Sequence, residues 1–104
     1  MKGFGEKLNS RKKNITNKNS KLSKEKIIAK AFQFHSQGNI QKAAEFYQDF
    51  INEGFKDERV FSNYGVILKN LKKLKEAELY LRKATKINPN FAEAHLNLGN
   101  ILID

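Results

Sequence analysis

Residues 58–91 read ERVFSNYGVILKNLKKLKEAELYLRKATKINPNF, and the same pattern recurs on either side of them at a spacing of 34. A shift of 34 along the chain aligns these sets: Ala31, Gly65 and Gly99; Ala43 and Ala77; Ile40 and Leu74; Asn63 and Asn97; Ile67 and Ile101; Leu68 and Leu102. Small and apolar residues that recur in one register are typical of stacked repeats. We therefore divide the chain into a first unit, residues 24–57, a second unit, residues 58–91, and the start of a third unit, residues 92–104.

Within each unit the apolar residues have helical spacing. In the second unit one stripe contains Phe61, Tyr64, Gly65 and Leu68, and another contains Leu74, Ala77, Leu81 and Ala84. We predict helices over residues 24–37, 40–54, 58–70, 74–87 and 91–103. Asp57 is placed to cap the third helix, and Asn88-Pro89-Asn90 is expected to end the fourth, because proline disfavours helical geometry in the residue before it.

The second unit resembles the tetratricopeptide repeat, which is a helical hairpin of fixed length. The resemblance rests on Asn63-Tyr64-Gly65, Ala77, Ala84 and residues 86–90, and residues 92–100 are similar to the first helix of a following unit. The resemblance implies an all-α fold in which antiparallel helical hairpins stack as a short right-handed solenoid of about two and a half repeats.

The first unit departs from this pattern at three positions. Phe50 stands where the family usually keeps a small residue, Phe55 where proline is common, and Lys30 where Tyr64 and Leu98 stand in the later units. We interpret residues 24–57 as a diverged end unit.

Glycines mark two kinds of position in the repeat. Gly65 and Gly99 cost up to about 1 kcal/mol each relative to alanine inside a helix, so we interpret them as residues that let two helices approach closely. Gly38 marks the turn between the two helices of the first unit, and Lys72 stands at its position in the second. The second turn is therefore expected to tolerate a side chain.

Composition excludes several classes of site. The 104 residues include no cysteine, so neither a disulfide framework nor a thiolate metal site can form. The two histidines, His35 and His95, lie far apart in the repeat series, whereas metal sites need clustered ligands. We find no nucleophile with a base at helical spacing and no glycine-rich phosphate loop. We expect a protein that is not an enzyme and that has no cofactor and no metal.

The distribution of apolar residues also bears on the location of the protein. No apolar run approaches membrane-spanning length, and residues 1–10 lack the apolar segment of a signal peptide. A cytoplasmic location is therefore expected.

Positive charge is concentrated at the start of the chain. Residues 1–23 contain seven Lys and Arg against Glu6 alone, so 7 minus 1 gives +6 of the total formal charge of +9. This segment is rich in Asn and Ser and has no apolar stripe, so we predict a disordered basic arm that ends at the helix cap Ser23. The arm is either an electrostatic attachment to nucleic acid or an anionic membrane, or a solubilising tail that reflects the lysine and asparagine bias of the chain.

By resemblance, the first helix of each unit lines a concave groove that binds a peptide. The family pattern places these residues of the second unit toward the ligand: Arg59, Ser62, Asn63, Val66, Lys69 and Asn70. Ile28, Ala29, Phe32 and His35 precede them in the first unit, and Leu96, Asn97 and Asn100 follow in the third. A side-chain amide both donates and accepts, so Asn63 and Asn97 can pair with the backbone of an extended peptide, unless asparagine is simply common at this position of the repeat.

The last predicted helix has no second helix after it in this sequence. We expect Leu98, Ile101, Leu102 and Ile103 to be only partly packed and to drive self-association into a homodimer through residues 96–103. Together these observations predict a protein-interaction module that binds a peptide or a partner helix in its groove. The alternatives are a basic adaptor whose arm binds nucleic acid or an anionic membrane, and the accessory repeat region of a group-transfer enzyme.

Overall fold

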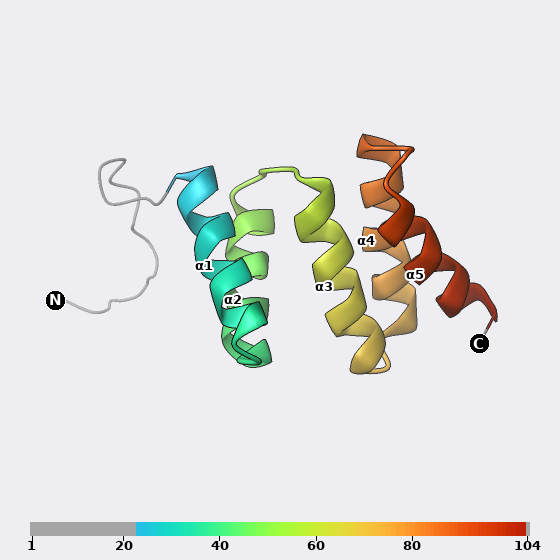
Figure 1. Ribbon diagram of the computed structural model, residues 1–104, viewed down its shortest axis with the longest axis horizontal. Helices are drawn as coiled ribbons and strands as arrows, with labels where there is room; N and C mark the ends of the chain where they lie inside the picture. Colours follow the sequence, from blue (N-terminus) through green and yellow to red (C-terminus); the bar gives the residue numbers. More distant parts are fainter. Residues whose placement is uncertain (1–22, 104) are drawn as a thin grey trace, which may run out of the picture.

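A computed structural model describes residues 23–103 of the chain as five α-helices, with no strand in that range. The helices are α1 (Lys24–Ser36), α2 (Ile40–Asn52), α3 (Glu58–Asn70), α4 (Leu74–Ile87) and α5 (Ala92–Ile103). They follow one another along the long axis of the molecule (Figure 1). The predicted all-α fold is confirmed, and each helix begins and ends within two residues of its predicted bounds. The predicted basic arm, apart from Ser23, lies outside the described residues.

Polar side chains cap three of the helices. Ser23 accepts a hydrogen bond from the backbone N–H of Lys26, and Asn39 accepts one from that of Lys42, each at 3.2 Å. Asp57 caps α3, as predicted from the sequence. These side chains satisfy backbone N–H groups that have no partner within the helix, so each helix start is fixed locally.

The turn inside each hairpin uses the left-handed backbone region. Gly38 ends the turn after α1 with φ of 79°, and Lys72, at the same position of the second unit, has φ of 67°. The second turn therefore accommodates a side chain, as predicted, although this conformation costs a residue other than glycine roughly 1–2 kcal/mol.

The helices pack as hairpins and the hairpins pack on each other. α1 packs against α2, and α3 packs against α4. α3 also contacts α2 and α5, and α4 contacts α5. α3 is therefore the central helix, because it joins the first hairpin, its own partner α4 and the start of the third unit.

The buried side chains form a core that crosses the boundaries between units. Val60 and Ile67 of α3 belong to the same cluster as Ala43, Tyr47 and Phe50 of α2. A second cluster joins Leu68, Ala77 and Leu81 to the α5 residues Leu98 and Ile101, and a third contains Phe61, Ala84 and Ala94. Neither hairpin buries its apolar side chains by itself, so the two units and α5 stabilise one another.

Two of the unusual residues of the first unit pack against each other. Phe50 and Phe55 replace the small residue and the proline that stand at Ala84 and Pro89 in the second unit. Phe50 is fully buried, and its ring centroid lies 5.5 Å from that of Phe55. The two larger side chains therefore contact each other, and Phe55 packs from the edge against the core cluster that contains Phe50.

Gly65 lies at a close approach between α3 and α4. A Cβ atom at this position would lie 2.8 Å from Cγ of Leu81 and 3.3 Å from the backbone oxygen of Ala77. The interpretation of Gly65 as a packing residue is therefore confirmed. The same interpretation of Gly99 is wrong for the described residues, because a Cβ atom at Gly99 would meet nothing within 4 Å.

Replacing these two glycines by alanine should have opposite effects on stability. Gly65→Ala should lower the free energy of unfolding by about 1–3 kcal/mol, because Leu81 and α4 must move to admit the methyl group. Gly99→Ala should leave it unchanged or raise it by up to about 1 kcal/mol, because alanine is the better helix former. Urea unfolding of both variants measures the difference. Equal stability of the two variants would contradict the close approach at Gly65.

Candidate functional site

The first helices of the units, α1, α3 and α5, carry the residues predicted to face a ligand. On α3, Arg59, Asn63, Val66 and Asn70 are spaced four, three and four residues apart, so they lie on one side of the helix. Arg59 and Asn70 are exposed, and Asn63 and Val66 are half-buried. We call this side of α3 and the equivalent sides of α1 and α5 the first-helix surface, which comprises Phe32, Arg59, Asn63, Val66, Asn70, Asn97 and Asn100.

Phe32 and Arg59 join the α1 part of this surface to the α3 part. The guanidinium carbon of Arg59 lies 5.3 Å from the centroid of the Phe32 ring. At this distance a cation is attracted to the face of an aromatic ring. Because Phe32 belongs to the first unit and Arg59 to the second, the contact makes the surface continuous across the boundary between them.

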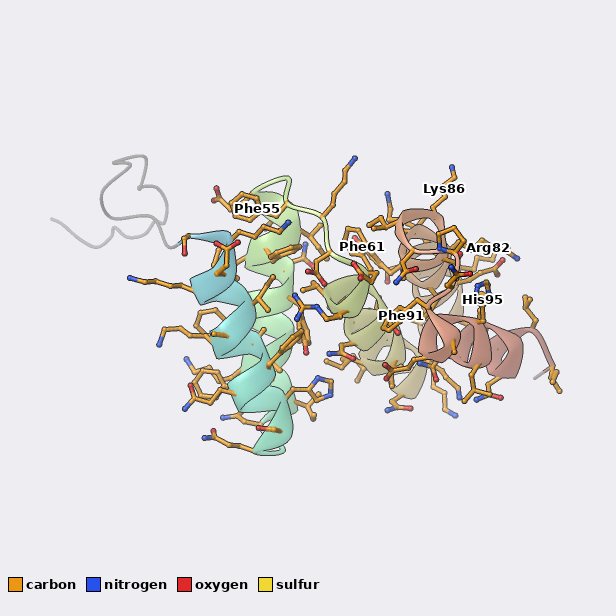
Figure 2. The ribbon with its side chains drawn as sticks, turned by 45° about the horizontal axis from the view of Figure 1, so that its top comes forward. Phe55, Phe61, Arg82, Lys86, Phe91 and His95 are labelled. Carbon is orange, nitrogen blue, oxygen red and sulfur yellow. The ribbon has the colours of Figure 1, made fainter. Side chains whose placement is uncertain are left out.

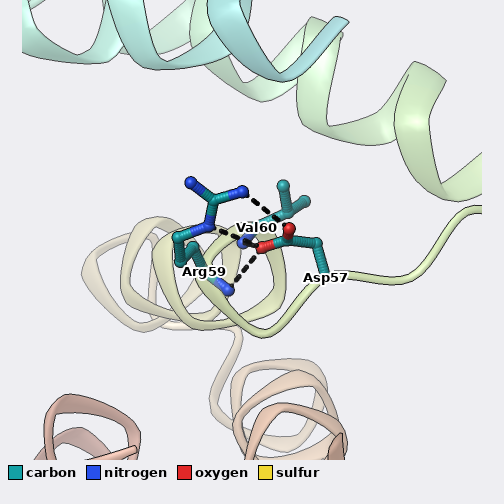
Figure 3. Close-up of polar contacts among 3 residues, drawn as sticks. All are labelled: Asp57, Arg59 and Val60. Atoms are coloured by element: carbon teal, nitrogen blue, oxygen red, sulfur yellow. Dashed lines mark hydrogen bonds and ion pairs between the residues drawn. The ribbon is translucent and has the colours of Figure 1, made fainter. Parts of the chain in front are cut away.

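Asp57 holds the Arg59 side chain in place (Figure 3). Arg59 donates from Nε to Oδ1 of Asp57 at 3.1 Å and from Nη2 to Oδ2 at 2.8 Å. Oδ1 also accepts the backbone N–H groups of Arg59, at 2.8 Å, and Val60, at 3.3 Å. One carboxylate therefore both caps α3 and orients the arginine that follows it.

The charges of this pair stabilise each other. Burial by itself would raise the pKa of the Asp57 carboxyl, but hydrogen bonds from Arg59 and Val60 and the charge of Arg59 outweigh burial and hold that pKa below its usual value. The hydrogen bond to Asp57 likewise raises the pKa of the Arg59 guanidinium. Both groups are ionised at neutral pH, so Arg59 is presented with its charge largely offset by its neighbour.

Tyr47 of α2 connects three helices through its hydroxyl group. The hydroxyl lies 2.7 Å from Nδ1 of His35 on α1, and it accepts a hydrogen bond from Nδ2 of Asn63 on α3 at 3.2 Å. In the tautomer of His35 that has no hydrogen on Nδ1, this nitrogen accepts the hydroxyl hydrogen, and the hydroxyl then both donates and accepts. Burial raises the pKa of Tyr47 to about 12, only partly opposed by the Asn63 hydrogen bond, so the group is protonated at neutral pH.

Asn63 therefore has a structural contact on one side and a polar group available on the other. One of its N–H groups is directed to Tyr47. Its side-chain oxygen accepts no hydrogen bond from residues 23–103. On α5, Asn97 is half-buried and Asn100 is exposed, and neither makes a side-chain hydrogen bond within the same range.

Two residues predicted to face a ligand are buried. Ser62 is fully buried, and its Oγ has no hydrogen-bond partner among the described residues. Ser62 precedes Asn63 directly, which rotates it by about 100° around the helix, into the packed side of α3. Ile28 lies in the first core cluster. The prediction that these two side chains reach a ligand is therefore wrong, and Lys69 is half-buried at the margin of the surface.

The packing of α5 buries two of the four residues of the predicted self-association edge and leaves the other two exposed. Leu98 and Ile101 are buried, with 9% and 7% of their surface exposed, in the cluster that contains Leu81. Leu102 and Ile103 are exposed to 57% and 84%. Leu98 and Ile101 therefore belong to the core, and the apolar surface of α5 consists of Leu102 and Ile103 together with Leu96.

The described residues contain neither a metal site nor a membrane span. Within residues 23–103, no three His, Cys, Asp or Glu side chains gather closely enough to hold a metal ion. None of the five helices has the length and apolar character that crossing a bilayer requires.

Comparison with known proteins assigns the central unit to a family. Residues 58–91 match the family model of the tetratricopeptide repeat. The second unit is a tetratricopeptide repeat. No curated protein matches the chain. Tetratricopeptide repeats generally mediate interactions between proteins, so the chain has the general character of a protein-interaction or scaffold module.

Two contacts of this repeat array were not predicted from the sequence. Asp57 was expected to cap α3, but its ion pair with the Arg59 side chain was not expected. A signal was available, because an arginine two residues after an acidic cap can fold back onto it. Tyr47 was not singled out at all, although it replaces the aliphatic Leu81 of the second repeat. A hydroxyl at a position that is otherwise apolar indicates a buried polar partner.

Removing the Tyr47 hydroxyl should destabilise the junction between the units. Tyr47→Phe should lower the free energy of unfolding by about 1 kcal/mol, because His35 and Asn63 lose their shared partner. Tyr80→Phe is the matched control, because no hydrogen bond of the Tyr80 hydroxyl occurs within the described residues. Urea denaturation of both variants gives the comparison. An equal response of the two variants would show that the hydroxyl bridge contributes nothing.

Self-association through α5 stays a prediction, now with corrected residues. Leu102→Lys combined with Ile103→Lys should shift any dimer toward monomer with little change in melting temperature, because both side chains are exposed. Leu98→Lys should instead disrupt the packing of α5, because it places a charge in the core. Light scattering over a wide concentration range measures the mass. A parent chain that is monomeric throughout rules out the dimer.

Proposed function

We propose that the first-helix surface is a groove that binds an extended peptide or a partner helix, and that the chain works as a binding module and not as an enzyme. The observation that carries the proposal is the position of Arg59. Its side chain is 53% exposed, yet it is fixed on one side by Asp57 and on another by Phe32. A polar group that is both accessible and already oriented loses little conformational entropy when a ligand binds.

The chemistry of Arg59 indicates which ligand groups it would contact. Nε and Nη2 each donate one hydrogen to Asp57, which leaves the two Nη1 hydrogens and the second Nη2 hydrogen for a ligand oxygen. Because Asp57 offsets the charge, the site favours a backbone carbonyl or a single carboxylate over a strongly acidic segment. The half-buried Phe32 ring beside the guanidinium offers an apolar contact for the neighbouring side chain of the ligand.

The asparagines extend the same chemistry along the solenoid. Asn63 presents its side-chain oxygen to a ligand. Asn97, one repeat later, presents both the oxygen and the N–H groups of its side-chain amide. An amide can pair with the N–H and C=O groups of an extended peptide whatever the peptide sequence. Val66 lies between the polar groups on α3 and supplies a second apolar contact. We therefore propose recognition of peptide backbone by Asn63 and Asn97, with Arg59 and Phe32 selecting one flanking position.

The alternatives predicted from the sequence rest on other parts of the molecule. Attachment of the basic arm to nucleic acid or to an anionic membrane concerns residues outside the described range. An accessory role beside a group-transfer enzyme would place the catalytic residues on another chain. Neither alternative uses the fixed arginine, so the first-helix surface carries our proposal.

Peptides selected against the intact chain from a random displayed library test this function. Arg59→Ala should weaken the binding of the selected peptides roughly tenfold or more, the range of an interface hot spot, and Asn97→Ala should weaken it without lowering stability. Arg82→Ala is the matched control, because Arg82 is 55% exposed and forms an equivalent 2.8 Å ion pair with Glu78 on α4. Equal effects of Arg59→Ala and Arg82→Ala, or no effect of either, would contradict the proposal.

A further inference from the structure

The outer side of α4 and the turn before it carry six cations. They are Lys72, Lys73, Lys75, Arg82, Lys83 and Lys86, and all six are exposed. On α4 the spacing of seven, eight and eleven from Lys75 places Arg82, Lys83 and Lys86 on one side of the helix. Figure 2 shows Arg82 and Lys86 projecting from α4 on the side away from Phe61 of α3. We call these six residues the α4 basic face.

The first repeat has no counterpart of this face. A shift of 34 along the chain places the six cations on Gly38, Asn39, Gln41, Gln48, Asp49 and Asn52. None of these residues is basic, and one is acidic. Residues 24–57 carry five cations and five anions, whereas residues 58–91 carry eight cations and three anions, a net charge of +5. The lysine bias of the whole chain therefore does not explain the α4 basic face.

Little of this charge is neutralised within the fold. Arg82 pairs with Glu78 at 2.8 Å. None of the five lysines forms an ion pair with another residue of the range 23–103. Cations held together on one helix side repel one another and produce a positive surface potential, which attracts a polyanion.

The type of cation indicates the type of polyanion. Five of the six residues are lysines, which act as point charges, whereas planar bidentate recognition of a single carboxylate or phosphate group favours arginine. Lysines suit a phosphate backbone, which is contacted by charge with little directional demand. The α4 basic face therefore suits a polyanion that is contacted through repeated charge and not through the geometry of one anionic group.

The aromatic residue of α4 favours double-stranded over single-stranded nucleic acid as the partner. Tyr80, the only aromatic residue of α4, packs against Phe61 and Tyr64 at ring distances of 5.8 and 5.2 Å. It therefore offers no platform on which single-stranded bases could stack. A duplex, whose bases are already stacked on each other, does not need one.

The charges of the first hairpin favour a duplex over an anionic membrane as the partner of the α4 basic face. The exposed Leu79 lies among the cations of α4 and is the one apolar side chain there that a membrane would favour. A planar anionic membrane would, however, also approach α2, which occupies the same place in the first hairpin and has no excess of cations there: Glu45 is paired with Lys42 at 4.0 Å, and Asp49 stands where α4 has Lys83. A narrow duplex that runs along α4 needs no cations on α2, whereas a membrane would gain nothing from that helix.

We propose that the α4 basic face binds the phosphate backbone of double-stranded nucleic acid without regard to base sequence. The face belongs to the second helix of the repeat, whereas the first-helix surface belongs to α1, α3 and α5, so the two sites do not share residues. The chain would then hold a duplex on one side and a protein ligand on another. This inference stands independently of the proposed peptide groove.

A salt series with two matched triple variants of the full chain tests the proposal. One variant is Lys75→Gln, Lys83→Gln and Lys86→Gln, and the control is Lys26→Gln, Lys30→Gln and Lys42→Gln. Both remove three exposed lysines from helices and replace them with a good helix former. The basic arm is present in every protein, so its contribution is the same. The probe is a short DNA duplex of arbitrary sequence.

For the α4 variant, the slope of log K against log salt should become shallower by about 0.9 for each phosphate that is no longer neutralised, so by about 2 to 3. The control variant should keep the slope of the parent. Equal changes in the two variants would show that only net charge matters and would overturn the proposal, as would a parent that does not bind the duplex at low salt.

Anionic phosphatidylserine vesicles provide the last comparison. The α4 variant should bind these vesicles as the parent does, because the proposal assigns the face to a duplex. Weaker vesicle binding by the α4 variant together with an unchanged DNA slope would assign the face to membranes and overturn the proposal as well.

Discussion

The buried side chain of Tyr47, with its ring and its hydroxyl group, is the constraint on which the relative placement of the first three helices depends. It comes from α2, and its partners His35 and Asn63 come from α1 and α3. Unlike an apolar contact, a buried hydroxyl has specific geometric demands, because leaving it without partners costs free energy. The Tyr47 ring adds contacts with Phe32, at 6.3 Å, and Tyr64, also at 6.3 Å. The register between the first hairpin and α3 is therefore fixed by hydrogen bonds as well as by packing.

The position of the candidate binding surface follows from that register. Because α3 is held against the first hairpin, Arg59 reaches the Phe32 ring, and the capping carboxylate of Asp57 holds the exposed guanidinium in that position. On its other side α3 approaches α4 at Gly65, where there is no room for a side chain. The helix is thus packed on both flanks, and the residues between those flanks are the ones that a ligand can reach. A site on helices supported in this way is better defined than one on a loop.

The two proposed surfaces differ in how their charge is balanced. On the first-helix surface, Arg59 is paired with Asp57, so binding there depends mainly on hydrogen bonds and apolar contacts and responds weakly to salt. On the α4 basic face, five lysines have no ion pair within the described residues, so binding there depends on the release of counterions and responds strongly to salt. The two proposed activities should therefore be separable by ionic strength alone.

The sequence by itself determined the repeat and the five helices, with ends placed to within two residues. The repeat register, the caps Ser23 and Asp57 and the Asn88-Pro89-Asn90 stop are local features, and local features need no knowledge of distant contacts. Gly65 was also recognisable, because a glycine inside an apolar helical stripe indicates a close approach. Only the tertiary structure decided which side of each helix is accessible. Adjacent residues such as Ser62 and Asn63 differ by about 100° around the helix, so which of them is buried depends on where α2, α4 and α5 lie. For the same reason Leu98 and Ile101 proved to be core residues, and the Tyr47 bridge, whose partners lie on two other helices, could not be seen in any local pattern.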